Sequence, residues 1–134
     1  MTAKEYLGQA YRLDQRINSK LEQVLSLREL TTKATATMSD MPSGGSRNVY
    51  RMQDIIAKIV DLENEINRDI DALVDLKREM VATIKAVADP ECQTLLELRY
   101  LCFKTWEQIA VDMQYSTRNI YKLHDRAIKE IKVP

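Results

Sequence analysis

The stretch that decides the fold is TWEQIAVDMQYSTRNIYKLHDRAIKEI, residues 105–131. It opens with capping-box spacing, in which Thr105 and Gln108 satisfy each other's backbone amides at the start of a helix. After a turn at residues 114–115, Ser116 is placed to cap a second helix. The stretch therefore predicts two short helices joined by a tight turn.

The apolar residues of these two predicted helices share an inner side. Ile120 follows Ala110 by ten residues, and Leu123 follows three residues later. This spacing lets two helices lock around one core in a helix-turn-helix, with a small residue where they cross. We expect the inner side of the second helix to consist of Ile120, Leu123, Ala127 and Ile131.

A third short helix is predicted just before this pair. Asp89 can cap it, and Pro90 suits its first position, where an amide would have no partner. The helix reads ECQTLLELRYL, and a short break follows at residues 102–104. Its packing candidates are Leu95, Leu96, Leu98 and Leu101. Residues 89–134 are thus predicted to form a three-helix module.

The N-terminal part predicts a long helix from about Ala3 to the mid-thirties. Thr2 and Glu5 have capping-box spacing. The apolar residues that follow at steps of three and four are Leu7, Ala10, Leu13, Ile17, Leu21, Val24 and Leu27. The stretch from Met38 to Asn48 holds a proline and two of the three glycines, so we expect a loop and the most protease-sensitive point there.

A second, longer helix is predicted after this loop from a seven-residue apolar repeat. The repeat consists of Met52, Ile59, Ile66, Leu73, Met80 and Val87. Ile55, Leu62 and Leu76 fall three residues after its members, and Ile56, Ile70 and Ile84 fall four after. Such a repeat is typical of a coiled coil. The charged residues between are expected to form a solvated face.

These elements predict an all-α chain with two parts. Residues 1–88 would form an antiparallel helical hairpin, a coiled-coil arm with its loop at 38–48. Residues 89–134 would form the helix-turn-helix domain. Because the first helix is too short to cover the whole stripe of the second, we expect either the C-terminal module or a second copy of the chain to cover the rest. A homodimer through the long helices is therefore a hypothesis.

Composition narrows the class of protein. Charged residues make up 30% of the chain, and Gly and Pro contribute three residues each, which favours helix. Lys plus Arg and Asp plus Glu number 20 each, so the net charge is zero. Residues 115–134, however, carry five basic against two acidic side chains. That local excess is the part suited to nucleic-acid contact.

Several kinds of site are not expected. Cys92 and Cys102 lie ten residues apart without a CxxC pair, and His124 is the one histidine, so we expect two reduced, mostly buried thiols and neither metal nor cofactor. No Gly-rich phosphate loop or nucleophile–base pair suggests an enzyme. We also expect no signal peptide, no membrane contact, and a cytoplasmic location in a bacterial host cell.

A helix-turn-helix would present the N-terminal part of residues 116–130 to double-stranded DNA. Arg118 can donate two hydrogen bonds to guanine, and Thr117 can contact a thymine methyl group. The free amides at Ser116 suit a phosphate. The full set of predicted DNA-binding residues is Ser116, Thr117, Arg118, Asn119, Tyr121, Lys122, Arg126 and Lys129. His124 is expected to pack or bond locally, and Trp106 to anchor the core.

Residues 89–132 resemble the fourth region of bacterial sigma-70-type factors, the module that reads the promoter −35 element. The matching residues are Leu95, Leu98, Arg99, Tyr100, Thr105, Glu107, Ile109, Ala110, Ser116, Ile120, Arg126, Ala127 and Ile128. Gln114 departs from the glycine usual at the turn, and a positive φ there would cost about 1 kcal/mol.

The whole chain also resembles a family of small phage and prophage proteins, some described as ArpU-type late transcription regulators. They share a helical N-terminal half, a PSG-type loop and an LELRY…W-IA…S…Y-LH module. These resemblances imply a transcription regulator that binds a promoter or docks on RNA polymerase. Two alternatives stay open: a DNA-packaging subunit of small-terminase type, and a protein-interaction module without DNA.

Overall fold

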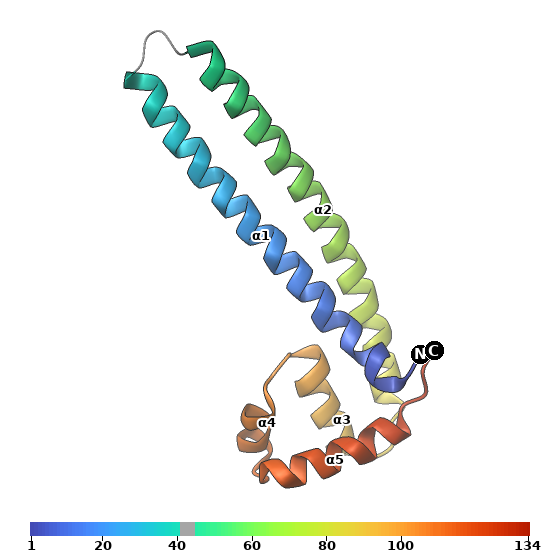
Figure 1. The fold of residues 1–134 in the computed structure, drawn as a ribbon. Helices are drawn as coiled ribbons and strands as arrows, with labels where there is room; N and C mark the ends of the chain where they lie inside the picture. The colour runs from blue at the N-terminus through green and yellow to red at the C-terminus, as the bar shows by residue number, and fades with distance from the viewer. Residues whose placement is uncertain (41–44) are drawn as a thin grey trace. The chain divides into compact units, whose positions relative to one another are not determined.

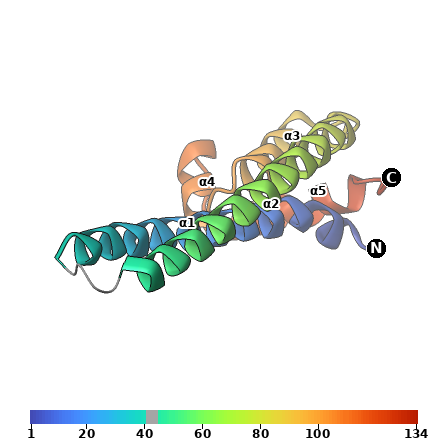
Figure 2. The ribbon, with the colours of Figure 1, turned by 90° about the horizontal axis from the view of Figure 1, so that it is seen from above.

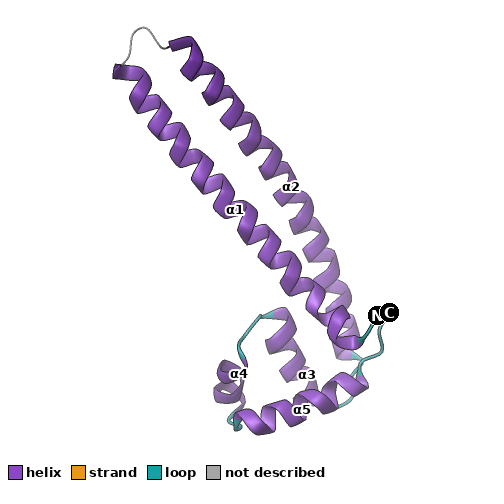
Figure 3. Ribbon diagram, in the orientation of Figure 1, coloured by secondary structure: helices purple, strands orange, loops and turns teal. Residues whose placement is uncertain are grey.

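The computed structural model describes residues 1–40 and 45–134, and the side chains outside residues 37–48. Every described element is helical (Figures 1 and 3). The elements are α1 (Ala3–Asp40), α2 (Gly45–Lys85), α3 (Pro90–Leu96), the π-helical turn η1 (Glu97–Leu101), α4 (Trp106–Met113) and α5 (Thr117–Glu130). The predicted all-α class, with two long helices before a group of short ones, is confirmed.

Both long helices extend into the loop predicted at residues 38–48. Helix α1 continues to Asp40 and α2 begins at Gly45, so the prediction is wrong for residues 38–40 and 45–48. Serine and glycine are tolerated at helix ends, so a loop-like composition does not mark the last helical residue. The centre of that loop, residues 41–44, lies outside the described residues, as does the protease-sensitive point expected there.

The chain divides into two compact units, which we call the arm and the head. The arm is Gln15–Asp71, and the head combines Met1–Asp14 with Ala72–Pro134. The head thus includes the first turns of α1 and the last turns of α2 together with all the short helices. The division into domains at residue 89 stays a prediction.

In the arm, α1 and α2 lie side by side and run antiparallel (Figures 1 and 2). Their seam buries Ile17 and Val24 of α1 and Ile59 and Ile66 of α2. Burial of such side chains is worth about 1.5–3 kcal/mol each. The seam is bordered by ion pairs from Lys20 to Asp69 at 2.6 Å and to Glu65 at 3.6 Å, and from Arg28 to Glu63 at 2.5 Å.

Within the arm, Ile59 and Ile66 of the seven-residue repeat are buried, but apolar residues beside the repeat are not. Ile56 and Ile70, four residues after members of the repeat, remain 48% and 41% exposed. Ile84, at the equivalent position in the head, is fully buried. One partner helix covers a narrow seam of a coiled coil, whereas the short helices of the head supply the additional cover.

The head has one core, to which every helix contributes. Its buried residues are Tyr6, Leu7, Ala10, Met80, Ile84, Val87, Cys92, Leu95, Leu96, Ile109, Ala110, Ile120, Leu123, Ala127 and Ile131. The inner side predicted for α5 is therefore confirmed at all four positions. Of the residues predicted to pack from residues 91–101, Leu95 and Leu96 are buried, while Leu98 and Leu101 are partly buried against this core.

The short helices begin where the capping patterns place them. The Asp89 side chain accepts from the Glu91 amide at 2.9 Å, with Pro90 following in the first turn. Thr105 and Gln108 form the reciprocal capping box. Thr2 and Glu5 do the same at the start of α1. These local bonds satisfy amides that a helix leaves unpaired, which is why residue type and spacing predict them.

Two irregular backbone features lie in the head. Gln114 adopts the left-handed conformation expected of it, with φ 59°. Phe103 does so too, with φ 58°, and no sequence pattern predicts it. The sequence pattern also predicts ordinary helix over residues 97–101, whereas η1 closes with a bond from the Cys102 amide to the Glu97 carbonyl at 3.1 Å. The wider turn moves the chain out of α-helical register before the break at residues 102–104.

Both cysteines are free thiols, but they differ in exposure. Cys92 is buried in the core, as predicted. Cys102 is exposed, so that part of the prediction is wrong. Cys102 follows the last residue of η1, where the chain leaves the helix and helical periodicity no longer predicts which side chains are buried.

Replacing Gln114 with glycine should stabilise the head, because glycine adopts positive φ without the steric clash of a Cβ atom. We expect the free energy of unfolding to rise by about 1 kcal/mol, measured by urea denaturation. Val111→Gly is the matched control: this exposed residue lies inside α4, so glycine there should lower stability. A Gln114→Gly protein no more stable than the wild type would contradict the strain argument.

Candidate nucleic-acid interface

Helices α4 and α5 are joined by a tight, hydrogen-bonded turn. The Gln114 amide donates to the Val111 carbonyl at 3.2 Å, and the Tyr115 amide donates to the Ala110 carbonyl at 3.0 Å. The Ser116 hydroxyl oxygen then accepts from the Asn119 amide at 3.1 Å and starts α5. Gln114, Tyr115 and Ser116 each make one of these hydrogen bonds. The turn therefore fixes the position of the start of α5 against α4.

Helix α5 separates into a buried and an exposed side. All eight residues predicted to contact DNA are exposed: Ser116, Thr117, Arg118, Asn119, Tyr121, Lys122, Arg126 and Lys129. The structure brings Ser116 to Lys122 together in the first two turns, whereas Arg126 and Lys129 follow further along the helix. Among the residues that the structure describes, Arg118 and Lys122 make no hydrogen bond or ion pair, so their charges are available to a ligand.

Arg126 differs from the other basic residues of α5. Its guanidinium donates to the Asp89 carboxylate at 2.5 Å and to the Cys92 sulfur at 3.8 Å. The bond from the Glu91 amide, followed by the charge of Arg126, lowers the pKa of Asp89. Asp89 therefore stays ionised, and it neutralises much of the charge that Arg126 would otherwise offer to a phosphate.

An acidic edge borders α5 on the side of α3. The Tyr115 hydroxyl donates to the Glu91 carboxylate at 2.8 Å, a bond that raises the pKa of Tyr115. Glu91, Tyr115, Asn119, Lys122, Leu123 and Arg126 line a shallow depression here. Sequence reasoning missed Glu91 and Tyr115, because the bond that joins them spans 24 residues and no local pattern indicates it.

A cluster of aromatic and cationic side chains supports the middle of α5. Tyr100 and His124 share a hydrogen bond of 2.6 Å between the hydroxyl and Nε2. The Trp106 ring lies edge-on to His124, with centroids 4.7 Å apart, and also contacts Tyr121 at 5.3 Å. Aromatic pairs at these separations contribute about 0.5–1.5 kcal/mol beyond the area they bury. Tyr121 thus covers Trp106 with part of its ring while remaining 47% exposed.

Arg99 ties this cluster to the irregular segment before α4. Its guanidinium stacks over Trp106, 4.3 Å from the ring centroid, and donates to the Lys104 carbonyl at 2.9 Å. Trp106 is partly buried against the core, in agreement with its predicted anchoring role. Of the sequence features, only the resemblance to sigma-type factors singles out Arg99 and Tyr100. Their contacts give them a positioning role beneath α5.

Burial lowers the pKa of His124 to about 4, with a further contribution from the charge of Lys4. The ring is therefore neutral near pH 7. The neutral ring can accept from Tyr100 through Nε2, whereas the imidazolium can only donate. His124 is 5% exposed and hydrogen-bonded, which confirms the expectation that it packs and bonds locally.

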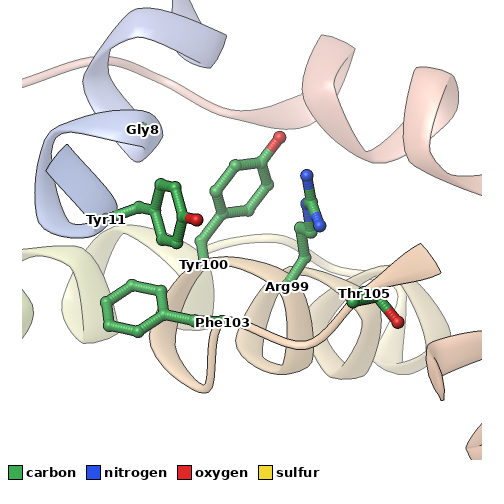
Figure 4. A pocket seen from close by; sticks show the side chains of 6 residues that line it. All are labelled: Gly8, Tyr11, Arg99, Tyr100, Phe103 and Thr105. Carbon is green, nitrogen blue, oxygen red and sulfur yellow. The ribbon is translucent and has the colours of Figure 1, made fainter. Parts of the chain in front are cut away.

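A small hollow lies at another part of the head. It is lined by Gly8, Tyr11, Arg99, Tyr100, Phe103 and Thr105 and has a volume of about 230 Å³. Figure 4 shows the rings of Tyr11, Tyr100 and Phe103 grouped at one end and the Arg99 side chain beside them. Pockets for small molecules occupy roughly 300–1,000 Å³, so this hollow has room for little more than a side chain. We assign it no cofactor.

Two other kinds of site are absent from the part of the chain that the structure describes. In residues 1–40 and 45–134, no group of three or more His, Cys, Asp or Glu side chains could hold a metal ion. Within the same part of the chain, no helix combines the length and the apolar character needed to cross a membrane.

The fold that carries this site is an all-α chain in which a helix-turn-helix arrangement follows two long helices. The chain belongs to a family described as "Protein of unknown function (DUF1492)", whose model matches residues 30–132. No curated protein and no solved structure gives a significant match. Because the family description carries no activity, the function has to be argued from the site.

Acidification should destabilise the fold through His124. The unfolded chain takes up a proton at the ordinary pKa of 6.5, whereas the folded ring stays neutral until about pH 4. Above pH 6.5 both states hold the neutral ring, so this loss of stability begins below that pH. It reaches about 3 kcal/mol near pH 4, at 1.36 kcal/mol per pH unit.

The measurement is urea denaturation from pH 7 to pH 4 for the wild type and for His124→Gln. Glutamine does not titrate and can still bond to Tyr100, so the variant should lose less stability over this range. The carboxylates affect both proteins alike, and the difference between the two curves isolates His124. Parallel curves would show that His124 does not titrate differently in the two states.

Proposed function

We propose that the protein is a sequence-specific, double-stranded-DNA-binding transcription regulator, and that α5 enters the major groove. The observation that carries this proposal is the exposed N-terminal half of α5, held against α4 by the turn at Gln114. In helix-turn-helix proteins the N-terminal residues of the second helix contact base edges. Here these residues are polar or basic, exposed, and supported from beneath by the cluster around His124.

Base reading would rest on Arg118 and Thr117. An arginine donates two hydrogen bonds to the O6 and N7 atoms of guanine, and the threonine methyl group packs against that of thymine. A good bidentate pair discriminates against the wrong base by about 1–3 kcal/mol. The Ser116 oxygen already accepts a bond as the helix cap, but its hydroxyl hydrogen can still be donated to a phosphate.

Backbone contacts would come mainly from Lys122 and Lys129. Arg126 contributes less, because Asp89 already neutralises it. The negative charge of Glu91 lies beside Lys122 and Arg126 and should weaken phosphate contacts on the side of α3. Since the chain as a whole carries no net charge, we expect modest non-specific affinity, with base contacts supplying most of the selectivity.

Removing two unpaired basic residues from the N-terminal half of α5 should abolish most DNA binding. We expect Arg118→Ala/Lys122→Ala to weaken binding to duplexes selected by the wild type from a random pool. The salt dependence should become shallower by up to about two ion equivalents, since two positive charges that displace counterions from DNA are lost. Fluorescence anisotropy across a salt series measures both quantities.

The matched control is Arg51→Ala/Lys58→Ala, which removes two positive charges from exposed positions on α2 of the arm. It should bind like the wild type. A wild-type protein that selects no duplex at low salt would refute direct DNA binding, and a protein partner, RNA polymerase first, would then be sought. Equal losses in the two double variants would show only a non-specific response to charge.

The ion pair at Asp89 gives a second, finer expectation. Lys122→Ala should reduce the salt slope by about one ion equivalent, whereas Arg126→Ala should reduce it by less than half of that. Both variants remove one positive charge from α5, so each serves as the control for the other. Equal reductions would mean that DNA breaks the pair between Arg126 and Asp89.

A further inference from the structure

One side of the arm carries a row of exposed apolar side chains, which we call the apolar face. Its members are Leu21 (45% exposed) and Leu25 (62%) of α1, with Ile56 (48%), Val60 (49%) and Ile70 (41%) of α2. A hollow bordered by Leu21, Leu25, Glu63 and Asn67 joins the two helices on this side of the arm. Val60 lies three residues before Glu63 and Ile70 three residues after Asn67, so helical periodicity places both on the same side.

The opposite side of the arm also has a hollow. It is bordered by Gln23, Ser26, Lys58, Asp61 and Glu65 together with Leu27 and Leu62. Those two leucines are only partly exposed, whereas the members of the apolar face are each more than 40% exposed. Exposed apolar side chains gathered on one surface are typical of a site that a partner covers.

The residues on this side of α2 are arranged symmetrically about one position of the sequence. Such an arrangement favours a second copy of the same chain as the partner. Val60 and Ile70 each lie five residues from position 65, and Glu63 and Asn67 each lie two residues from it. A two-fold dimer requires each position to meet its mirror position in the other copy. About an axis at position 65, Val60 meets the partner subunit's Ile70, and Glu63 meets the partner subunit's Asn67.

The chemistry of the polar pair agrees with this antiparallel pairing. Asn67 offers amide donors, and the Glu63 carboxylate has acceptor capacity beyond its bond with Arg28. A parallel pairing in register would instead place Glu63 beside its own copy, and like charges repel. The positions of Glu63 and Asn67 thus favour antiparallel over parallel pairing of the two α2 helices.

Helix α1 has the same centre of symmetry. Leu21 and Leu25 each lie two residues from Gln23. Gln23 and Glu65 border the same hollow on the opposite side of the arm, so the two centres lie at one level of the helical pair. A single two-fold axis can therefore exchange Leu21 with Leu25 and Val60 with Ile70.

We propose that the arm binds a second copy of the chain through its apolar face, with the two α2 helices antiparallel about position 65, to form a four-helix bundle. The two arms would bury the apolar face that one arm leaves exposed. This inference does not depend on the proposed function. If both hold, one dimer presents two copies of α5 to DNA.

The test uses the full chain and two substitutions that the symmetry pairs. Val60→Lys and Ile70→Glu each place a charge in the proposed interface. Each should raise the dimer dissociation constant, measured by sedimentation equilibrium, by at least about 100-fold. In the double variant Val60→Lys/Ile70→Glu, each lysine meets a glutamate of the other copy, so the dimer should return.

Val111→Lys is the control, since it adds the same charge at a residue of the head that is 76% exposed. It should remain dimeric, and circular dichroism should show unchanged helix content in every variant. A wild-type chain that sediments as a monomer at high concentration, or as a larger ring, would overturn the proposal. So would single variants that stay dimeric, or a double variant that stays monomeric.

Discussion

Burial of the inner side of α5 is the constraint on which the rest of the head depends. Ile120, Leu123 and Ala127 enter a core that also holds residues of every other helix of the head. His124 enters with them, and a buried polar ring is stable only where it finds a partner. Tyr100 supplies that partner at 2.6 Å, so the hydrogen bond selects one rotation of α5 against η1. The apolar residues hold the helix in the head, and the polar pair specifies which side faces outward.

The candidate interface follows from this rotation. Once Ile120 and Leu123 point inward, helical periodicity turns Arg118 and Lys122 outward. The Trp106 and Arg99 side chains brace the same cluster, and Tyr121 closes over it. On the other border of α5, the contacts of Asp89 and Glu91 add negative charge and engage Arg126 and Tyr115. The exposed side is thus electrostatically uneven, with available positive charge concentrated near the N-terminal half of the helix.

The arm illustrates a different consequence of helix packing. A pair of helices buries one seam, here the repeat at Ile59 and Ile66, and any second apolar row on the same helix stays exposed. Ile56, Val60 and Ile70 form such a row. In the head, Ile84 continues the same register but is fully buried, because more than two elements meet there. The same sequence pattern therefore has different outcomes in the two units, and the difference provides the physical motive for association through the arm.

Local interactions account for what the sequence by itself determined. Caps at Asp89, Thr105 and Ser116 bond within three residues, and apolar periodicity identified the inner side of α5, so the helix starts and the exposed side of α5 could be predicted. Only the tertiary structure decided that Arg126 is neutralised by Asp89, 37 residues away, and that Tyr100 meets His124, 24 residues away. It also decided the π-helical turn, the left-handed Phe103 and the exposure of Cys102. These features depend on contacts between residues far apart in the chain. Local sequence patterns therefore do not predict them.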